Sequence, residues 1–188
     1  DHDRPIIPLL PDTSGITAMI FDSTALPEQV VQDVVTSAFR SAGQRCSALR
    51  LLVLQEDVAE RTLEMLAGAM DSLIVGDPAD QRTDVGPVID QPSYDKLMGH
   101  RAAMQERWIK TVPAPAEGLF VPPTLIRLDA IEDLRREWFG PLLHVTTWKG
   151  GELVETVRRI NSSGFALTMG LHSRIARAAQ TVQAGGTV

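Results

Sequence analysis

Leu49-Arg50-Leu51-Leu52-Val53-Leu54 is a continuous apolar run that only Arg50 interrupts. A run of this length without polar alternation is typical of a parallel β-strand that is covered on both faces. The segment before it follows a helical period over 27–43, and another helical segment begins at Asp57. The order helix, buried strand, helix therefore predicts a parallel sheet with helices packed on it.

The same alternation continues in both directions along the chain. It predicts an α/β fold, a doubly wound and mostly parallel sheet with flanking helices. Asp57 is expected to cap the second helix, which ends before Gly76. The expected strands are 16–21, 49–54, 119–128, 142–148 and 166–172, and the expected helices are 27–43, 57–75, 92–107, 153–160 and 174–182.

Composition excludes several classes of protein. The chain has 188 residues, of which 44% are hydrophobic and 22% are charged, enough apolar content for one globular domain. A net charge of −6 and the lack of a Lys/Arg-rich run argue against a nucleic-acid partner. No apolar stretch approaches the roughly 20 residues of a membrane helix, and no signal peptide is recognised. We therefore expect a cytoplasmic protein.

Cys46 is the single cysteine of the chain, so an internal disulfide is excluded. A lone cysteine is more often a packing residue than a nucleophile. Here it lies in a small polar loop between a helix and a strand, where the neighbouring Arg45 could favour a thiolate. None of the four histidines is spaced from it as a metal ligand, so no metal site is predicted. From these residues alone, Cys46 can be either a packing residue or a nucleophile.

Two carboxylates have unusual neighbours. Asp12 lies in a turn before the first expected strand, and Glu137 directly precedes Trp138-Phe139-Gly140-Pro141. Taken alone, Asp12 reads as a turn-forming residue and Glu137 as an exposed charge at a helix end. The chain carries neither a G-x-G-x-x-G nor a Walker A sequence, so it has no nucleotide-binding fingerprint of its own.

Several of these stretches together resemble the aldehyde dehydrogenase superfamily. The resemblance covers nearly the whole chain and is closest to one branch, the L-glutamate γ-semialdehyde (pyrroline-5-carboxylate) dehydrogenase module of bifunctional proline utilization A enzymes. It rests on four motifs in the family's order, the nucleophile motif 41–48, the D-x-G-P turn 84–87, the E-x-F-G-P motif 137–141 and the segment 161–168.

The resemblance implies a role for each site residue. Cys46 would be the nucleophile, with Ser47 and Arg45 at the substrate aldehyde, and Glu137 and Phe139 would meet the nicotinamide ribose and ring. Asp12, 34 residues before Cys46, falls on the general-base position. The family uses glutamate there, and aspartate is one methylene shorter.

The resemblance also implies what lies outside the chain. Residues 1–188 would be a single catalytic domain, with the Rossmann domain that holds most of the NAD elsewhere in the parent polypeptide. FAD would serve only the parent's proline dehydrogenase domain, and the parent is expected to be a homo-oligomer. We expect the isolated chain to be inactive. The alternative is a non-catalytic module of the same fold that serves assembly or channelling.

Overall fold

Strands of the computed structural model form one mixed sheet in the order β3-β4-β5-β2-β1-β6. The structure describes residues 15–164 and 167–185. Neighbouring strands are parallel except β3 and β4, which are antiparallel. The α/β fold and the mostly parallel sheet are therefore confirmed. The strands are β1 (Thr17–Phe21), β2 (Leu49–Gln55), β3 (Trp108–Thr111), β4 (Thr124–Arg127), β5 (Leu142–Trp148) and β6 (Met169–His172).

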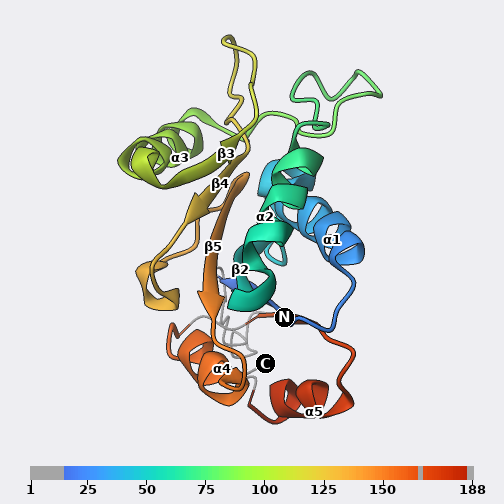
Figure 1. Ribbon diagram of the computed structural model, residues 1–188. Helices are drawn as coiled ribbons and strands as arrows, with labels where there is room; N and C mark the ends of the chain where they lie inside the picture. Colours follow the sequence, from blue (N-terminus) through green and yellow to red (C-terminus); the bar gives the residue numbers. More distant parts are fainter. Residues whose placement is uncertain (1–14, 165–166, 186–188) are drawn as a thin grey trace, which may run out of the picture.

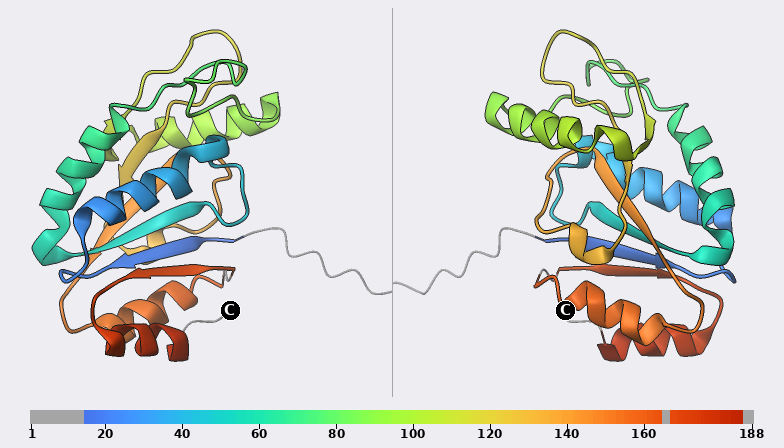
Figure 2. Two further views of the ribbon diagram at one scale, coloured as in Figure 1. Left: turned by 90° about the vertical axis from the view of Figure 1, so that its right-hand side faces the viewer. Right: turned by 60° about the vertical axis from the view of Figure 1, so that its left-hand side comes forward.

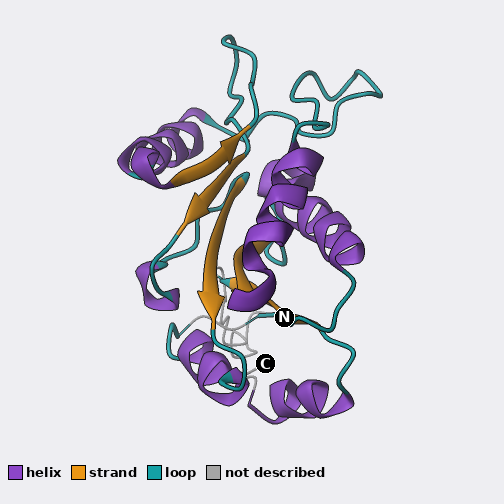
Figure 3. Cartoon of the chain, in the orientation of Figure 1, coloured by secondary structure: helices purple, strands orange, loops and turns teal. Residues whose placement is uncertain are grey.

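Helices flank the sheet on both sides. The helix α1 packs against α2 and both contact β2, whereas α4 packs against α5. In the left view of Figure 2 the strands β2, β1 and β6 run between these two helix pairs, and Figure 3 separates the helices from the loops. The helices are α1 (Pro27–Phe39), α2 (Glu56–Met70), α3 (Gln91–Ala103), α4 (Leu153–Asn161) and α5 (Ala176–Gly185).

Burial explains why the sequences of the central strands are continuous apolar runs. All seven residues of β2 are buried, and six of the seven in β5 are. Arg50 belongs to this interior, because only 1% of it is exposed.

No helix within the described ranges is long and apolar enough to span a membrane.

Several element ends differ from the sequence expectations. The segment Trp108–Thr111, for which no strand was expected directly after the helix 92–107, is the antiparallel edge strand β3. Asp57 does not cap α2, because that helix already begins at Glu56, and it ends at Met70 rather than before Gly76. The expected strand 119–128 shortens to β4, which starts after Pro122 and Pro123, residues that lack the N–H a strand ladder needs.

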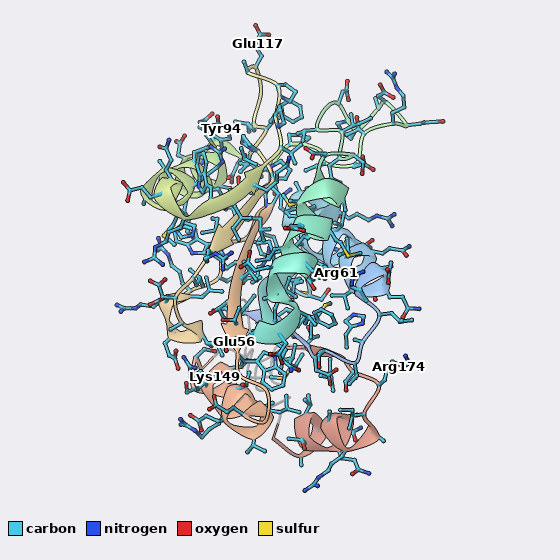
Figure 4. All side chains as sticks on the ribbon, in the orientation of Figure 1. Glu56, Arg61, Tyr94, Glu117, Lys149 and Arg174 are labelled. Atoms are coloured by element: carbon cyan, nitrogen blue, oxygen red, sulfur yellow. The ribbon has the colours of Figure 1, made fainter. Side chains whose placement is uncertain are left out.

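The amino ends of the parallel strands gather at one edge of the sheet. Register pairs Thr17 with Leu49, so the chain enters β1 and β2 side by side. In Figure 1 the β4 and β5 arrows point away from this edge, and the loops 71–90 and 112–123 extend beyond it. Figure 4 places Glu117 at the tip of the second loop and Lys149 and Arg174 at the opposite end of the molecule.

A left-handed turn precedes the loop that carries Cys46. In η1 (Arg40–Gly43), a single helical turn after α1, Ser41, Ala42 and Gly43 have φ of 57°, 51° and 65°. This turn ends α1 at Phe39, earlier than the expected residue 43. A Cβ atom on Gly43 would lie 2.2 Å from the carbonyl oxygen of Gly140, so the two glycines are in backbone contact. Glycine is required at position 43 for both conformation and space.

We predict that Gly43→Ala destabilises the chain by about 2 kcal/mol or more, because the new methyl meets backbone atoms and φ is positive. Gly68→Ala is the matched control. Gly68 is inside α2 with no atom within 4 Å of an added Cβ, so alanine should raise stability by roughly 0.5–1 kcal/mol. Urea unfolding midpoints measure both changes, and equal effects of the two substitutions would contradict the prediction.

Candidate functional site

The loop before β2 presents its polar side chains to solvent. Arg45, Cys46 and Ser47 are exposed, whereas Ala48 is buried where the strand begins. The guanidinium of Arg45 donates to the carbonyl oxygens of Thr36 and Ser37 at the end of α1, at 3.1 and 3.2 Å. An exposed thiol on a fixed loop is open to reaction, unlike a filler cysteine.

Gln44 fastens this loop to the D-x-G-P turn. Its amide nitrogen donates to the carbonyl oxygen of Pro87 at 3.3 Å, and its amide oxygen accepts from the N–H of Ile89 at 2.8 Å. The turn is itself closed by Asp84, whose carboxylate accepts from the N–H of Ile74 at 2.9 Å. Two motifs far apart in the sequence therefore form one surface.

The buried guanidinium of Arg50 joins three segments beneath this surface. It donates to Glu137 Oε1 from Nε and Nη2, to the carbonyl oxygen of Gly140 at 3.1 Å, and to that of Arg45 at 3.1 Å. Burial lowers the pKa of Arg50 from its ordinary value, and the charge of Glu137 opposes this shift. A guanidinium does not lose its proton in proteins, so the pair is a buried salt bridge.

Glu137 is held from both sides. Its Oε1 lies 3.2 Å from Arg50 Nη2, and its Oε2 accepts from the N–H of Gly15 at 3.0 Å. Only 8% of the Glu137 side chain is exposed. The carboxylate therefore points inward, with three of its roughly four acceptor positions in use.

Phe139 supplies an exposed aromatic ring beside this pair. The residue is 42% exposed, and Arg50 Cζ lies 5.1 Å from the ring centroid. Since Arg50 also contacts the Arg45 carbonyl, the ring and the loop 44–47 are anchored to the same group. An exposed flat apolar ring suits contact with a planar heterocycle such as nicotinamide, while Glu137 retains one acceptor position for a hydroxyl donor.

Gly15 brings the first described residues to the loop that carries Cys46. A Cβ on Gly15 would lie 3.7 Å from the carbonyl oxygen of Cys46 and 3.1 Å from Cβ of Leu167. The chain thus passes next to Cys46 just before it enters β1. Asp12, the expected general base, lies outside the described residues, so its role stays a prediction.

Behind the site, two histidines form a hydrogen-bonded pair. Nε2 of His100 and Nε2 of His144 are 2.9 Å apart, and Nδ1 of His144 lies 3.3 Å from the carbonyl oxygen of Arg50. A carbonyl only accepts, so His144 carries its proton on Nδ1 and its Nε2 accepts from His100. The His100 ring also stacks on Trp138 at 3.7 Å between centroids.

Both histidines are held neutral. Burial, followed by the charge of Arg136, lowers the pKa of His100 to about 4. Burial, followed by the interaction with His100, lowers the pKa of His144 to about 3. Since protonation would place two N–H groups face to face, the pair is an acid-sensitive support for β5 and α3.

The site lies at the amino edge of the sheet. Ligands of open α/β sheets usually bind at the opposite edge, outside the carboxyl ends of the strands. At the carboxyl edge there is a hollow of about 430 Å³ lined by Asp22, Gln55, Trp148 and residues of α4 and α5. The Gln55 amide in this hollow is already paired, since it accepts from Ser23 N–H and donates to Asp57. In the part of the chain that the structure describes, no three potential metal ligands are grouped.

The residues predicted for the site are Cys46, Asp12, Ser47, Arg45, Glu137 and Phe139, and the prediction does not include Arg50, Gln44 or Gly15. The structure brings the loop 44–47 together with Glu137 and Phe139 through Arg50. One signal was available, because Arg50 is the only charged residue in an apolar strand. A buried charge requires a partner, and that requirement points to a carboxylate.

Comparison with known proteins agrees with this geometry. The family model "Aldehyde dehydrogenase family" matches residues 3–188, and the chain belongs to this family. Among individual relatives, it is 49% identical over 178 residues to the bifunctional protein PutA of Klebsiella aerogenes, covering 89% of this chain and 14% of that protein. It is 33% identical to the 1-pyrroline-5-carboxylate dehydrogenase of Geobacillus kaustophilus, covering 88% of this chain and 33% of that protein.

Solved structures show the same fold. A crystal structure of bifunctional proline utilization A superimposes with a TM-score of 0.94 at 51% identity, covering 99% of this chain and 19% of that one. The proline utilization A of Bdellovibrio bacteriovorus superimposes with a TM-score of 0.85 at 27% identity, covering 92% of this chain and 18% of that one. The chain thus spans less than a fifth of the bifunctional proteins that it resembles.

We predict that iodoacetamide labels Cys46 in the folded chain at a rate close to that of the unfolded chain, because the thiol is exposed. Ala48→Cys in a Cys46→Ala background is the matched control. Position 48 is two residues away and 0% exposed, so its thiol should react only after unfolding. Protection of Cys46 equal to that of position 48 would support the filler reading instead.

The histidine pair predicts a fall in stability on acidification. Both pKa values are depressed in the folded state, so from about pH 6.5 down to about pH 4 the unfolded chain binds protons that the folded chain does not. Urea unfolding across this range should show a steep loss. His144→Leu should reduce the slope by close to one proton, whereas His172→Gln, outside the pair, should retain it. An unchanged slope in His144→Leu would contradict the depressed pKa of His144 in the folded chain.

Proposed function

We propose that this chain carries the nucleophile half of the active site of an NAD-dependent L-glutamate γ-semialdehyde dehydrogenase that acts in proline catabolism. The single observation that supports this most is the exposed Cys46 thiol on a loop joined to Glu137 and Phe139 through Arg50. The similarity to proteins named PutA and 1-pyrroline-5-carboxylate dehydrogenase supports the choice of substrate.

Cys46 would attack the aldehyde carbon as a thiolate and form a thiohemiacetal. The backbone N–H of Cys46 is the donor that this chain can offer to the oxyanion. Loss of hydride leaves a thioester on Cys46, and water activated by Asp12 releases glutamate and the free thiol. Ser47 and Arg45 would lie along the substrate. Aspartate at position 12 has a shorter reach than glutamate, so deacylation is the step expected to be slow.

The described residues fit the nicotinamide end of NAD. Phe139 would pack on the ring, and Glu137 Oε2 would accept from a ribose hydroxyl. When bound, NAD supplies the hydride acceptor. The chain carries no glycine-rich phosphate loop, so the rest of the cofactor would be held by a Rossmann domain elsewhere in the parent polypeptide.

The parent would be a cytoplasmic, bifunctional homo-oligomer in which residues 1–188 belong to a single catalytic domain. Its second active site would be an FAD-dependent proline dehydrogenase domain. On this proposal the isolated 188-residue chain does not oxidise aldehydes. A second candidate, a non-catalytic module of the same fold, is favoured by one observation, the aspartate at position 12 where the resembling family has glutamate.

The test uses the complete polypeptide that carries this chain. With L-glutamate γ-semialdehyde and NAD it should produce NADH, and Cys46→Ala should lower the rate by about 10³-fold or more. Ser173→Ala, on the opposite side of the molecule, is the control and should retain activity.

Folded, monodisperse wild-type polypeptide that produces no NADH from the semialdehyde would reject the catalytic proposal and support the non-catalytic module. Full activity in Cys46→Ala would reject the assignment of the nucleophile while leaving the substrate assignment intact. Circular dichroism of both variants separates these outcomes from a failure to fold.

A further inference from the structure

Arg50 is an unusual residue for its place in the fold. It is the second residue of β2, a strand that is buried along its whole length, and it is itself 1% exposed. Moving a cation into the interior costs several kcal/mol unless it is paired and hydrogen-bonded. An apolar residue would pack there without this cost, so the guanidinium needs an explanation beyond packing.

The contacts of Arg50 all lead to the candidate site. They are the carboxylate of Glu137, the carbonyl oxygen of Gly140, the carbonyl oxygen next to Cys46 in the chain, and the ring of Phe139. One rigid planar group thus fixes the distances between two loops that are about 90 residues apart, since Arg50 and Gly140 are separated by 90 positions.

The effect of Arg50 extends to the segment before β1. Arg50 occupies Oε1 of Glu137 twice, and Gly15 donates to Oε2. Oε2 is therefore the oxygen that retains a free acceptor position, and Arg50 does not contact it. If the guanidinium were lost, the carboxylate could turn, and both the Gly15 contact and the position of Oε2 would change.

We infer that Arg50 is a positioning residue of this site, which orients Glu137 for the cofactor and holds the nucleophile loop and the Gly15 segment in register with it. The inference rests on the proposed function for the identity of the cofactor. The geometry on which it is built concerns this chain alone. Arg50 touches neither substrate nor cofactor in this role and acts through Glu137.

Arg50→Lys is the informative substitution, because it keeps the positive charge and removes the planar set of N–H donors of the guanidinium. One ammonium nitrogen cannot reach the acceptors that Nε, Nη1 and Nη2 contact separately. Arg101→Lys is the matched control. Arg101 also donates to two side chains, Thr124 and Thr111, and lies over an aromatic ring, Trp108, but its side-chain hydrogen bonds reach neither Glu137 nor the loop 44–47.

In the complete polypeptide, Arg50→Lys should weaken equilibrium NAD binding about tenfold and leave the KM for the aldehyde within about twofold. Arg101→Lys should change neither. If Arg50 acts through Glu137, adding Arg50→Lys to Glu137→Gln should weaken NAD binding by less than about twofold more. An undiminished effect of Arg50→Lys in the Glu137→Gln background, or equal effects of the two lysine substitutions, would overturn the inference.

A second readout does not depend on activity. Hydrogen exchange at the Gly15 amide, followed in a peptide that contains Gly15 in its interior, should be about tenfold faster in Arg50→Lys and unchanged in Arg101→Lys. If the wild-type polypeptide neither bound NAD nor formed NADH, the proposed function would fail, and this exchange result would still decide the role of Arg50. Unchanged Gly15 exchange in Arg50→Lys would overturn that role.

Discussion

The constraint on which the site depends is the desolvated charge of Arg50. A cation that is 1% exposed inside a sheet must be satisfied by the protein, and here it is satisfied by one carboxylate and two carbonyl oxygens. Each of those acceptors belongs to a loop at the amino edge of the sheet. Removing one partner of a buried ion pair lowers stability by far more than the pair contributes to it. The positions of the loops and of the guanidinium therefore depend on each other.

The same requirement explains why the site lies at the amino ends of the strands. Carboxyl-end loops of parallel sheets usually hold ligands, and here the groups at that edge are already paired with one another. At the amino edge, the left-handed turn at Ser41 and Ala42 keeps two non-glycine residues in a costly conformation. The contact of Gly43 with the Gly140 backbone and the hydrogen bonds of Gln44 stabilise that turn. The strained residues thus lie in the turn that precedes the loop of Cys46.

The sequence predicted those parts of the fold that depend on local pattern. The runs 49–54 and 142–148 are strands within one residue of the expectation, because buried parallel strands have a continuous apolar signal. The edge strand β3 was missed, since Trp108 and Thr111 are partly exposed and pair with a strand that follows two prolines. The His100–His144 bond and the Arg50–Glu137 bridge join residues 44 and 87 positions apart, and no local pattern encodes such a contact. The motif resemblance located Cys46, Glu137 and Phe139, but not the group that connects them.

The surface above Arg50 and the interior below it have opposite character. Below, the neutral histidine pair joins β5 to α3 and contacts the Arg50 carbonyl. Above, Cys46 is exposed together with two apolar side chains on the same linked loops, Phe139 at 42% and Ile89 at 81%. Single exposed apolar residues are common on protein surfaces, but Ile89 is bonded to Gln44 directly and Phe139 is joined to the loop 44–47 through Arg50. On the proposed function, a rigid floor under this exposed surface is an advantage, because only the part of the parent polypeptide that covers the site then has to move.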